Sequence, residues 1–71
     1  MRILLIEDEK RMANFIERGL KEERYVVDVA YSGEKGIFLA ETSPYDLILL
    51  DIMLPDKDGI SICKDLRRRL L

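Results

Sequence analysis

The hydrophobic residues of this chain fall into two kinds of pattern that alternate along it. Short apolar runs occupy residues 2–6, 25–30 and 46–50, and each has the length and composition of a β-strand. The first and third runs contain four consecutive aliphatic residues, which is typical of strands buried on both faces of a parallel sheet. Asp28 lies inside the second run, so we expect that strand to lie near an edge of the sheet.

The segment after each run has apolar residues three or four positions apart, which is the spacing of one face of an α-helix. We expect the first helix to be capped by Asp8, with Glu9 in its first turn. The second helix is expected over residues 34–41, before Pro44, and the third after Gly59. The predicted packing faces are Met12, Phe15, Ile16, Gly19 and Leu20 in the first helix, Gly36, Ile37 and Ala40 in the second, and Ile62, Cys63, Leu66 and Leu70 in the third.

Strand and helix therefore alternate three times, which predicts an α/β fold in three layers with a parallel sheet and right-handed crossovers. The carboxyl ends of parallel strands meet at one edge of the sheet, where open α/β sheets bind their ligands. Glu7 and Asp8 follow the first strand and Asp51 follows the third, so these carboxylates converge if the two strands are parallel neighbours. Like charges so close together need a cation or protons. Hard oxygen ligands at an open site suit Mg²⁺.

The composition excludes several functions. A chain of 71 residues allows one domain, and an apolar fraction of 48% is enough for a core. A formal net charge of −2 gives no electrostatic basis for nucleic-acid binding by this segment. No apolar run approaches transmembrane length, so no membrane association is expected. A single cysteine, Cys63, and the lack of a secretory signal fit a reducing cytoplasm, and a chain without histidine is a poor zinc binder.

Two motifs follow the first and third strands. The first is Glu7-Asp8-Glu9, and the second is a loop with Asp51, Pro55 and Gly59 in the spacing Asp-x-x-x-Pro-x-x-x-Gly. Together with the apolar strands before them, these motifs resemble those of bacterial two-component response-regulator receiver domains. The resemblance extends over all 71 residues. It is greatest to regulators that carry a C-terminal winged-helix DNA-binding domain.

The resemblance implies a flavodoxin-like sheet with strand order 2-1-3 and a switch operated by phosphorylation. Asp51 would be the phosphoacceptor. Asp8 and Asp51 would bind Mg²⁺, Glu7 would act mainly through water, and the backbone carbonyl of Met53 would complete the protein ligands. A sensor histidine kinase or a small phosphodonor would supply the phosphoryl group. The parent protein would control transcription, and the domain would be a signalling module, with at most self-catalysed phosphorylation.

A complete receiver has five strands and five helices, so the resemblance implies that residues 1–71 form a truncated receiver domain that stops after the third helix. The Ser or Thr of strand four and the Lys of strand five would lie outside this chain, and we expect impaired phosphotransfer without them. The third strand would be an edge strand with an apolar run. Such an edge is a template for pairing, so we expect a homodimer through strand three.

Other interpretations fit some of these residues. Glu7, Asp8 and Glu9 could serve only as the start of a helix, and a single Asp after a strand is a common first residue of a loop. A haloacid-dehalogenase-type phosphatase would need a second Asp where Met53 stands, and a dinucleotide-binding fold would need a glycine-rich turn after the first strand. The remaining alternative is a self-associating half-fold without signalling activity.

Overall fold

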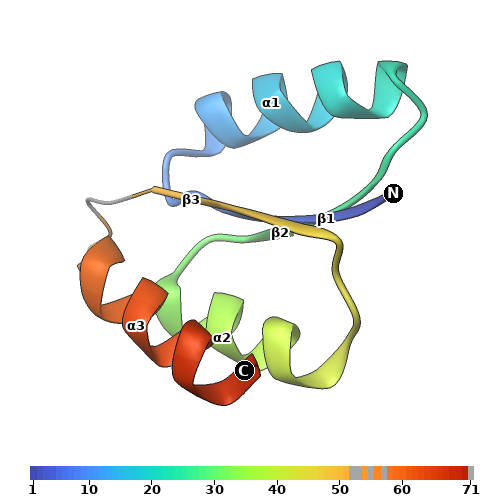
Figure 1. Cartoon of the computed structure of the whole chain (residues 1–71). Helices are drawn as coiled ribbons and strands as arrows, with labels where there is room; N and C mark the ends of the chain where they lie inside the picture. The colour runs from blue at the N-terminus through green and yellow to red at the C-terminus, as the bar shows by residue number, and fades with distance from the viewer. Residues whose placement is uncertain (52–53, 55, 57, 71) are drawn as a thin grey trace.

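The chain folds into three strands and three helices that alternate along the sequence (Figure 1). The computed structural model describes residues 1–51, 54, 56 and 58–70, with side chains up to residue 68. All six predicted elements are confirmed, and where bounds were predicted the ends differ by at most one residue. They are β1 (Arg2–Ile6), α1 (Lys10–Glu22), β2 (Val26–Ala30), α2 (Gly33–Thr42), β3 (Leu47–Leu50) and α3 (Gly59–Leu70).

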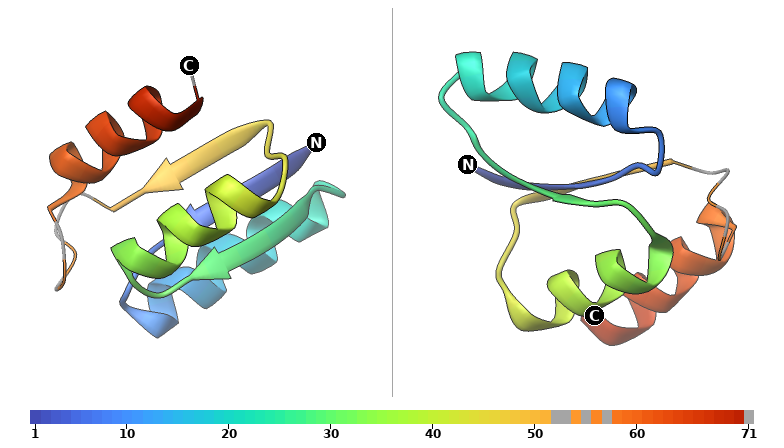
Figure 2. Two further views of the ribbon diagram at one scale, coloured as in Figure 1. Left: turned by 90° about the horizontal axis from the view of Figure 1, so that it is seen from below. Right: turned by 180° about the vertical axis from the view of Figure 1, so that it is seen from behind.

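The three strands form one parallel sheet in the order β2-β1-β3, as predicted. In its register Leu4 lies beside Asp28 on one side and beside Ile48 on the other. The strand that contains Asp28 is therefore an edge strand, as the polar interruption indicated. Figures 1 and 2 show the three layers, with α1 alone over one face of the sheet and α2 and α3 together over the other.

The face beneath α2 and α3 carries the larger core. Leu4 and Ile6 point into it from the central strand and are fully buried, together with Ile62 of α3. Gly36 of α2 lies directly on the sheet, because a Cβ built there would come within 2.7 Å of the Ile6 side chain. The small-residue face predicted for α2 is thus the face that packs closest to the central strand.

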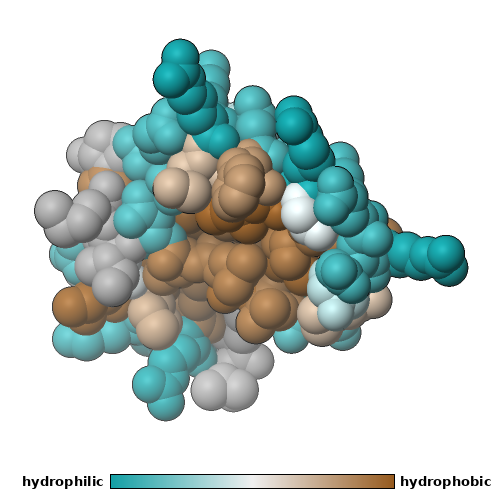
Figure 3. Space-filling view, turned by 90° about the horizontal axis from the view of Figure 1, so that it is seen from above, coloured by the Kyte–Doolittle hydropathy of each residue, from teal (hydrophilic) through white to brown (hydrophobic). Residues whose placement is uncertain are grey.

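The face beneath α1 is only partly covered. Ala13 is fully buried against Ile3 and Leu5 of the central strand, and the stripe that packs around it also contains Ile16 and Leu20. The prediction that Met12 and Phe15 belong to the buried face was wrong, since they are 48% and 76% exposed. Two apolar stripes run one residue apart along this helix, and only the stripe through Ala13 has the sheet beneath it. Figure 3 shows the resulting hydrophobic surface on this side of the molecule.

The third helix also differs in part from its predicted face. Ile62 and Leu66, one turn apart, are buried as expected, whereas Cys63 is exposed. Cys63 lies about a quarter-turn away from this stripe, toward the open side of β3, where nothing in the described chain covers it. The side chain of Leu70 lies outside the described residues. Among the described helices, none has the length and hydrophobicity needed to cross a bilayer.

Candidate functional site

The acidic residues predicted to converge do lie together at the carboxyl edge of the sheet. The hydrogen-bond pattern of the sheet extends one residue beyond the strands, since the Glu7 N–H donates to the Ala30 carbonyl at 3.0 Å and the Asp51 N–H to the Ile6 carbonyl at 2.9 Å. These bonds fix the backbone from which the carboxylates project. Glu7, Asp8 and Asp51 each offer a carboxylate oxygen, and these oxygens lie within 4.8 Å of one another. Glu7 and Asp51 are half-buried.

The electrostatics of this cluster are unfavourable for three negative charges. The Glu9 N–H donates to the Glu7 carboxylate, which by itself lowers the pKa of Glu7. Burial of Glu7, its hydrogen bond to Asp51 and the charges of Asp51 and Asp8 act in the opposite direction and together raise the pKa of Glu7 above its ordinary value. Glu7 therefore holds its proton more tightly than a free glutamate, which is the response expected of a carboxylate that is partly buried and close to like charges.

The start of α1 differs from the prediction in a way that matters for the site. Glu9, and not Asp8, is the N-cap of α1, so the prediction for Asp8 was wrong. The Glu9 carboxylate accepts the Arg11 N–H at 3.1 Å and the Met12 N–H at 2.8 Å, which satisfies two free donors of the first turn. Because Glu9 takes this role, the Asp8 carboxylate joins the cluster with Glu7 and Asp51.

The loop after Asp51 is attached to the rest of the fold at the points where it is described. Leu54 is buried in the core beneath α2 and α3. Asp56 accepts backbone N–H groups from Gly33 and Glu34 at the start of α2, each at 2.9 Å. Sequence reasoning missed this role of Asp56, because its partners lie 22 and 23 residues away and leave no local signal. Met53, the predicted carbonyl ligand, lies outside the described residues.

The second acid of the loop has a local role. Asp58 Oδ1 accepts the Ser61 N–H and Asp58 Oδ2 accepts the Ser61 hydroxyl, both at 2.9 Å. The Ser61 N–H bond, together with the Ser61 hydroxyl, lowers the pKa of Asp58. The helix start predicted at Gly59 is confirmed, and Asp58 caps it.

The cluster fits a hard divalent cation on the chemistry of its donors. Its three members are carboxylates, they come from two adjacent strand ends, and their oxygens are near enough to share one ion. Carboxylate oxygens at a partly open site are the protein ligands that Mg²⁺ uses while keeping several waters. A bound cation would also offset the repulsion that raises the pKa of Glu7.

Comparison with known proteins places the chain in a family. The model of the response regulator receiver domain family matches residues 3–70. The chain therefore belongs to the response regulator receiver domain family, whose members are signalling domains of two-component systems. The resemblance inferred from the two acidic motifs is confirmed.

Two relatives are regulators much longer than this chain. The response regulator ArlR of Staphylococcus saprophyticus is 48% identical over 67 residues, which cover 94% of this chain and 30% of that protein. The transcriptional regulatory protein CusR of Escherichia coli is 49% identical over 67 residues, again 94% of this chain and 30% of the relative. The chain thus spans about 30% of the length of these curated relatives.

Solved structures share the fold closely. The receiver domain of a Francisella response regulator has a TM-score of 0.93 and 38% identity, covering 97% of this chain and 57% of that one. The response regulator TrrA of Thermotoga maritima, solved with Mg²⁺ and BeF, has a TM-score of 0.91 and 33% identity, covering 94% and 58%. A chain in the complex of the histidine kinase ThkA with TrrA has a TM-score of 0.91 and 32% identity, covering 96% and 59%.

Proposed function

We propose that Asp51 is the phosphoacceptor of this chain and that Asp8 and Asp51 bind the Mg²⁺ ion on which phosphorylation depends. The observation that carries the proposal is the cluster of Glu7, Asp8 and Asp51 at the carboxyl edge of the sheet, with carboxylate oxygens within 4.8 Å of one another. The comparison with TrrA supports it, because that protein was solved with Mg²⁺ and BeF.

Each residue has a defined task in this proposal. An Asp51 carboxylate oxygen attacks the phosphorus atom of the donor, a new O–P bond forms, and the bond from phosphorus to the donor's leaving group breaks. Bound Mg²⁺ would supply charge neutralisation for the transferring oxygens. Asp8 holds a fixed negative charge beside Asp51 to bind the cation, and Glu7 acts through water. The backbone carbonyl of Met53 is the remaining proposed ligand.

The partner that would supply the phosphoryl group is a sensor histidine kinase. The complex of ThkA with TrrA supports this assignment, since it joins a histidine kinase to a regulator of the same fold. Regulation of transcription by the parent protein is proposed from the names of relatives such as CusR. Signalling of this kind would take place in the cytoplasm. Residues 1–71 would be the first part of a receiver domain and would act as a phosphoacceptor, not as an enzyme with turnover.

The phosphoacceptor assignment is tested with acetyl phosphate and Mg²⁺. Intact mass followed by peptide mapping should place any added phosphoryl group on Asp51, and Asp51→Asn should take up none. A complete receiver also supplies a Ser or Thr and a Lys from later strands, so we expect the 71-residue chain to be labelled slowly. Labelling on another residue with Asp51 unmodified would overturn the proposal. Rapid labelling at Asp51 would show that the later residues matter less than expected.

The metal assignment is tested by calorimetry or by chemical-shift titration with Mg²⁺. The chain should bind Mg²⁺ with a dissociation constant in the millimolar range, on the order of the weak sites that use few carboxylates. Asp8→Ala should abolish the response. Asp65→Asn is the matched control, because it removes one acidic charge from the ion pair with Arg68 on α3, which is not part of the cluster. An unchanged response in Asp8→Ala would show that the site is assigned wrongly.

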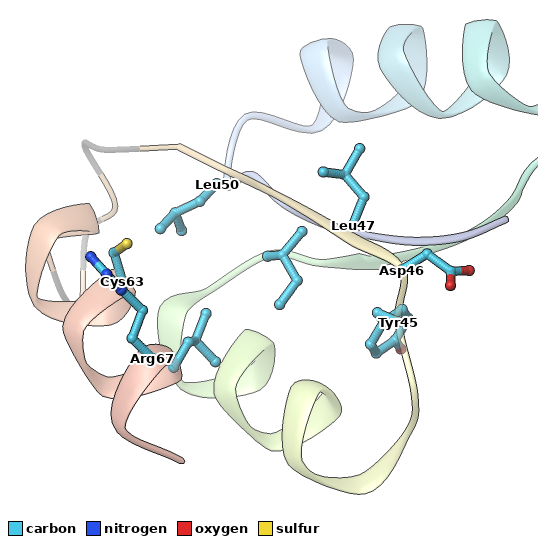
Figure 4. A pocket seen from close by; sticks show the side chains of 8 residues that line it. Tyr45, Asp46, Leu47, Leu50, Cys63 and Arg67 are labelled. Carbon is cyan, nitrogen blue, oxygen red and sulfur yellow. The ribbon is translucent and has the colours of Figure 1, made fainter. Parts of the chain in front are cut away.

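We also propose that two copies of the 71-residue chain associate through β3. Within the described sheet β3 pairs with β1 on one side, and its other side has no strand partner. A groove of about 420 Å³ runs along this side between β3 and α3, with Leu47, Leu50, Cys63 and Arg67 in its lining (Figure 4). Leu47 is 42% exposed. An open apolar edge of this kind is a template for strand pairing.

Sedimentation at micromolar concentration tests the association. The chain should sediment as a dimer, and Leu47→Lys should shift it to the monomer, because a charged edge residue opposes pairing. A charge at the half-buried Ile48 should act more strongly but could unfold the chain, so circular dichroism must accompany it. A folded monomer of the unmodified chain would overturn this proposal without affecting the phosphoacceptor assignment. Family membership favours signalling over the alternative of a half-fold that only self-associates.

A further inference from the structure

Asp56 makes a contact that neither the metal cluster nor the helix that follows it requires. Its Oδ1 accepts the Gly33 N–H and its Oδ2 accepts the Glu34 N–H, each at 2.9 Å, so the two carboxylate oxygens each bind one donor. Both donors belong to the first turn of α2. Asp56, in the loop that starts at Asp51, therefore bonds to the first turn of α2, a helix that precedes β3 in the sequence.

This contact completes the capping of α2. A helix begins with N–H groups that have no partner inside the helix. Asp56 takes the first two, and the hydroxyl of Ser32 takes the Lys35 N–H at 3.1 Å. Gly33 is buried in the fold that contains Asp56, whereas Glu34 and Asp56 itself are exposed. A carboxylate is also favoured by the helix dipole at this position.

The same contact is one of three attachments of the described residues from Asp51 to Asp56. Asp51 is held at its own N–H by the Ile6 carbonyl at 2.9 Å, and Leu54 is buried in the core between these points. Asp56 then joins the loop to α2 by two charge-assisted hydrogen bonds, which are about twice as strong as neutral ones. Asp51, Leu54 and Asp56 are thus attached to β1, to the core and to α2, respectively.

We propose that Asp56 is a positioning residue for the Asp51 site. By bonding to α2 it restrains the chain that follows Asp51, so that Asp51 stays placed beside Asp8 to bind Mg²⁺, and it couples occupation of the site to the first turn of α2. This inference rests on the proposed metal site at Asp8 and Asp51, and it extends that site to a residue that touches neither the cation nor the phosphoryl group.

A simpler role for Asp56 is only to stabilise α2 as a distant cap. The two roles predict different effects on Mg²⁺ affinity when Asp56 is replaced. A cap alone changes the stability of the fold and leaves the affinity of the folded protein for Mg²⁺ unchanged. A positioning residue changes that affinity, because residues that orient ligands from behind alter metal binding by roughly 10- to 100-fold when removed.

The experiment compares Mg²⁺ affinity in four forms of the 71-residue chain: the unmodified chain, Asp56→Ala, Asp56→Asn and Asp58→Ala. Asp56→Ala should weaken Mg²⁺ binding by about 10-fold, the lower end of the range for residues behind a metal site. Asp56→Asn keeps one oxygen acceptor and should recover part of the loss. Asp58→Ala is the matched control, since Asp58 is also a loop acid that caps a helix, but its bonds go to Ser61 of its own helix α3.

Amide chemical shifts provide a second readout of coupling. In the unmodified chain the Gly33 and Glu34 amides should shift as Mg²⁺ is added, with the same midpoint as the cluster residues. In Asp56→Ala their Mg²⁺-dependent shift should be lost. If Asp56→Ala is too unstable to measure, Asp56→Asn carries the comparison, with an intermediate affinity and smaller shifts expected.

The outcomes separate the two proposals. Equal Mg²⁺ affinity in Asp56→Asn, Asp58→Ala and the unmodified chain, with Gly33 and Glu34 amides that do not respond to Mg²⁺, would reduce Asp56 to a cap and overturn the inference alone. Failure of the unmodified chain to bind Mg²⁺ would overturn the proposed site and this inference with it. Weakening by Asp58→Ala equal to that by Asp56→Ala would also overturn the inference, because general destabilisation would then explain both.

Discussion

Carboxylates toward the two ends of the sheet have opposite surroundings, and their pKa values shift in opposite directions. Arg2 and Tyr45, at the start of β1 and before β3, reach the carboxylate of Asp28 in the middle of β2, whose Oδ2 accepts the Arg2 guanidinium at 3.0 Å and the Tyr45 hydroxyl at 2.7 Å. The Tyr45 bond first, and then the Arg2 bond and charge, lower the pKa of Asp28. At the other end Glu7 has two carboxylates for neighbours, Asp8 and Asp51, and the pKa of Glu7 is raised.

The difference indicates where binding of a cation from solution would stabilise the fold most. The Arg2 guanidinium also lies 5.1 Å from the centre of the Tyr45 ring, so Asp28, Arg2 and Tyr45 compensate one another inside the fold. In the cluster around Asp51 the nearby charges are those of other carboxylates, and the charges of Asp51 and Asp8 contribute to the raised pKa of Glu7. A divalent cation there removes an existing repulsion and adds attraction, whereas a cation near Asp28 would compete with a guanidinium already in place.

The largest expected effect is therefore a response to Mg²⁺ at one end of the sheet and none at the other. A ten-fold excess of Mg²⁺ over its dissociation constant should raise the free energy of unfolding by about 1.4 kcal/mol, by mass action. Asp8→Asn should abolish this increase, and Asp28→Asn should keep it although its starting stability is lower. Urea unfolding with and without Mg²⁺ measures all three. A response lost in both variants would show that the two ends are not independent.

The second expected effect is a loss of stability at the compensated end. Asp28→Ala removes the acceptor shared by Arg2 and Tyr45, and we expect the free energy of unfolding to fall by about 1–2 kcal/mol. The expected loss is small because the Arg2 and Asp28 side chains are 40% and 35% exposed, and water screens part of the interaction. Tyr45→Phe, which removes one hydrogen bond and keeps the ring, should cost less. A loss in Tyr45→Phe equal to that in Asp28→Ala would assign the whole effect to the hydroxyl.

The sequence predicted the parts of the fold that local patterns and topology determine together. The aliphatic runs of β1 and β3 identify buried parallel strands, and parallel strands must end at the same edge of the sheet. The approach of Glu7, Asp8 and Asp51 follows from these two facts once β1 and β3 are neighbours. The strand order came from the family resemblance, because periodicity does not say which strands are neighbours.

The sequence could not predict which of two adjacent stripes a helix would bury. Along α1 the stripe through Met12 and Phe15 is richer in large apolar side chains than the stripe through Ala13, and counting hydrophobic residues favours it. The sheet beneath α1 selects Ala13, since a small residue allows the helix to approach the central strand. The prediction that Cys63 lies on the packing face of α3 was wrong for a similar reason. Ile62 and Leu66 occupy the buried side of that helix.

The contacts of Asp56 show a further limit of the sequence. An acid just before a helix is a recognisable cap, and Asp58 before α3 fits this pattern. Asp56 caps α2, which begins 23 residues earlier in the chain, and this pairing exists only after β3 has been placed beside β1. A residue whose partner is set by tertiary structure gives no local signal.

A smaller effect is expected from removing one charge at the crowded end. Glu7→Gln keeps the shape of the side chain and removes repulsion from Asp8 and Asp51. Without metal the free energy of unfolding should rise by about 0.5 kcal/mol, which is the scale of interactions between partly exposed charges. Thermal unfolding in the presence of a chelator measures the difference. A less stable Glu7→Gln chain would show that the hydrogen bonds of Glu7 outweigh the repulsion.

The smallest expected effect is on the pH dependence of stability, where the two ends should have opposite signs. The lowered pKa of Asp28 gives stability that is present above its unfolded value of about 3.9 and is lost as the pH falls through the folded pKa. The raised pKa of Glu7 has the reverse effect. Its contribution is fully present below the unfolded value of about 4.3 and is lost as the pH rises through the folded pKa.

Urea unfolding without metal between about pH 2 and pH 6 can separate these contributions, since the unfolded values of both groups lie inside that window. Asp28→Asn should flatten the acid side of the stability curve, because its charge no longer has to be neutralised against Arg2 and Tyr45. Glu7→Gln should remove the decline on the side where Glu7 ionises and leave the acid side unchanged. Equal slopes in both variants would show that Asp28 and Glu7 do not differ as their surroundings predict, and the contrast between the two ends of the sheet would then have no thermodynamic basis.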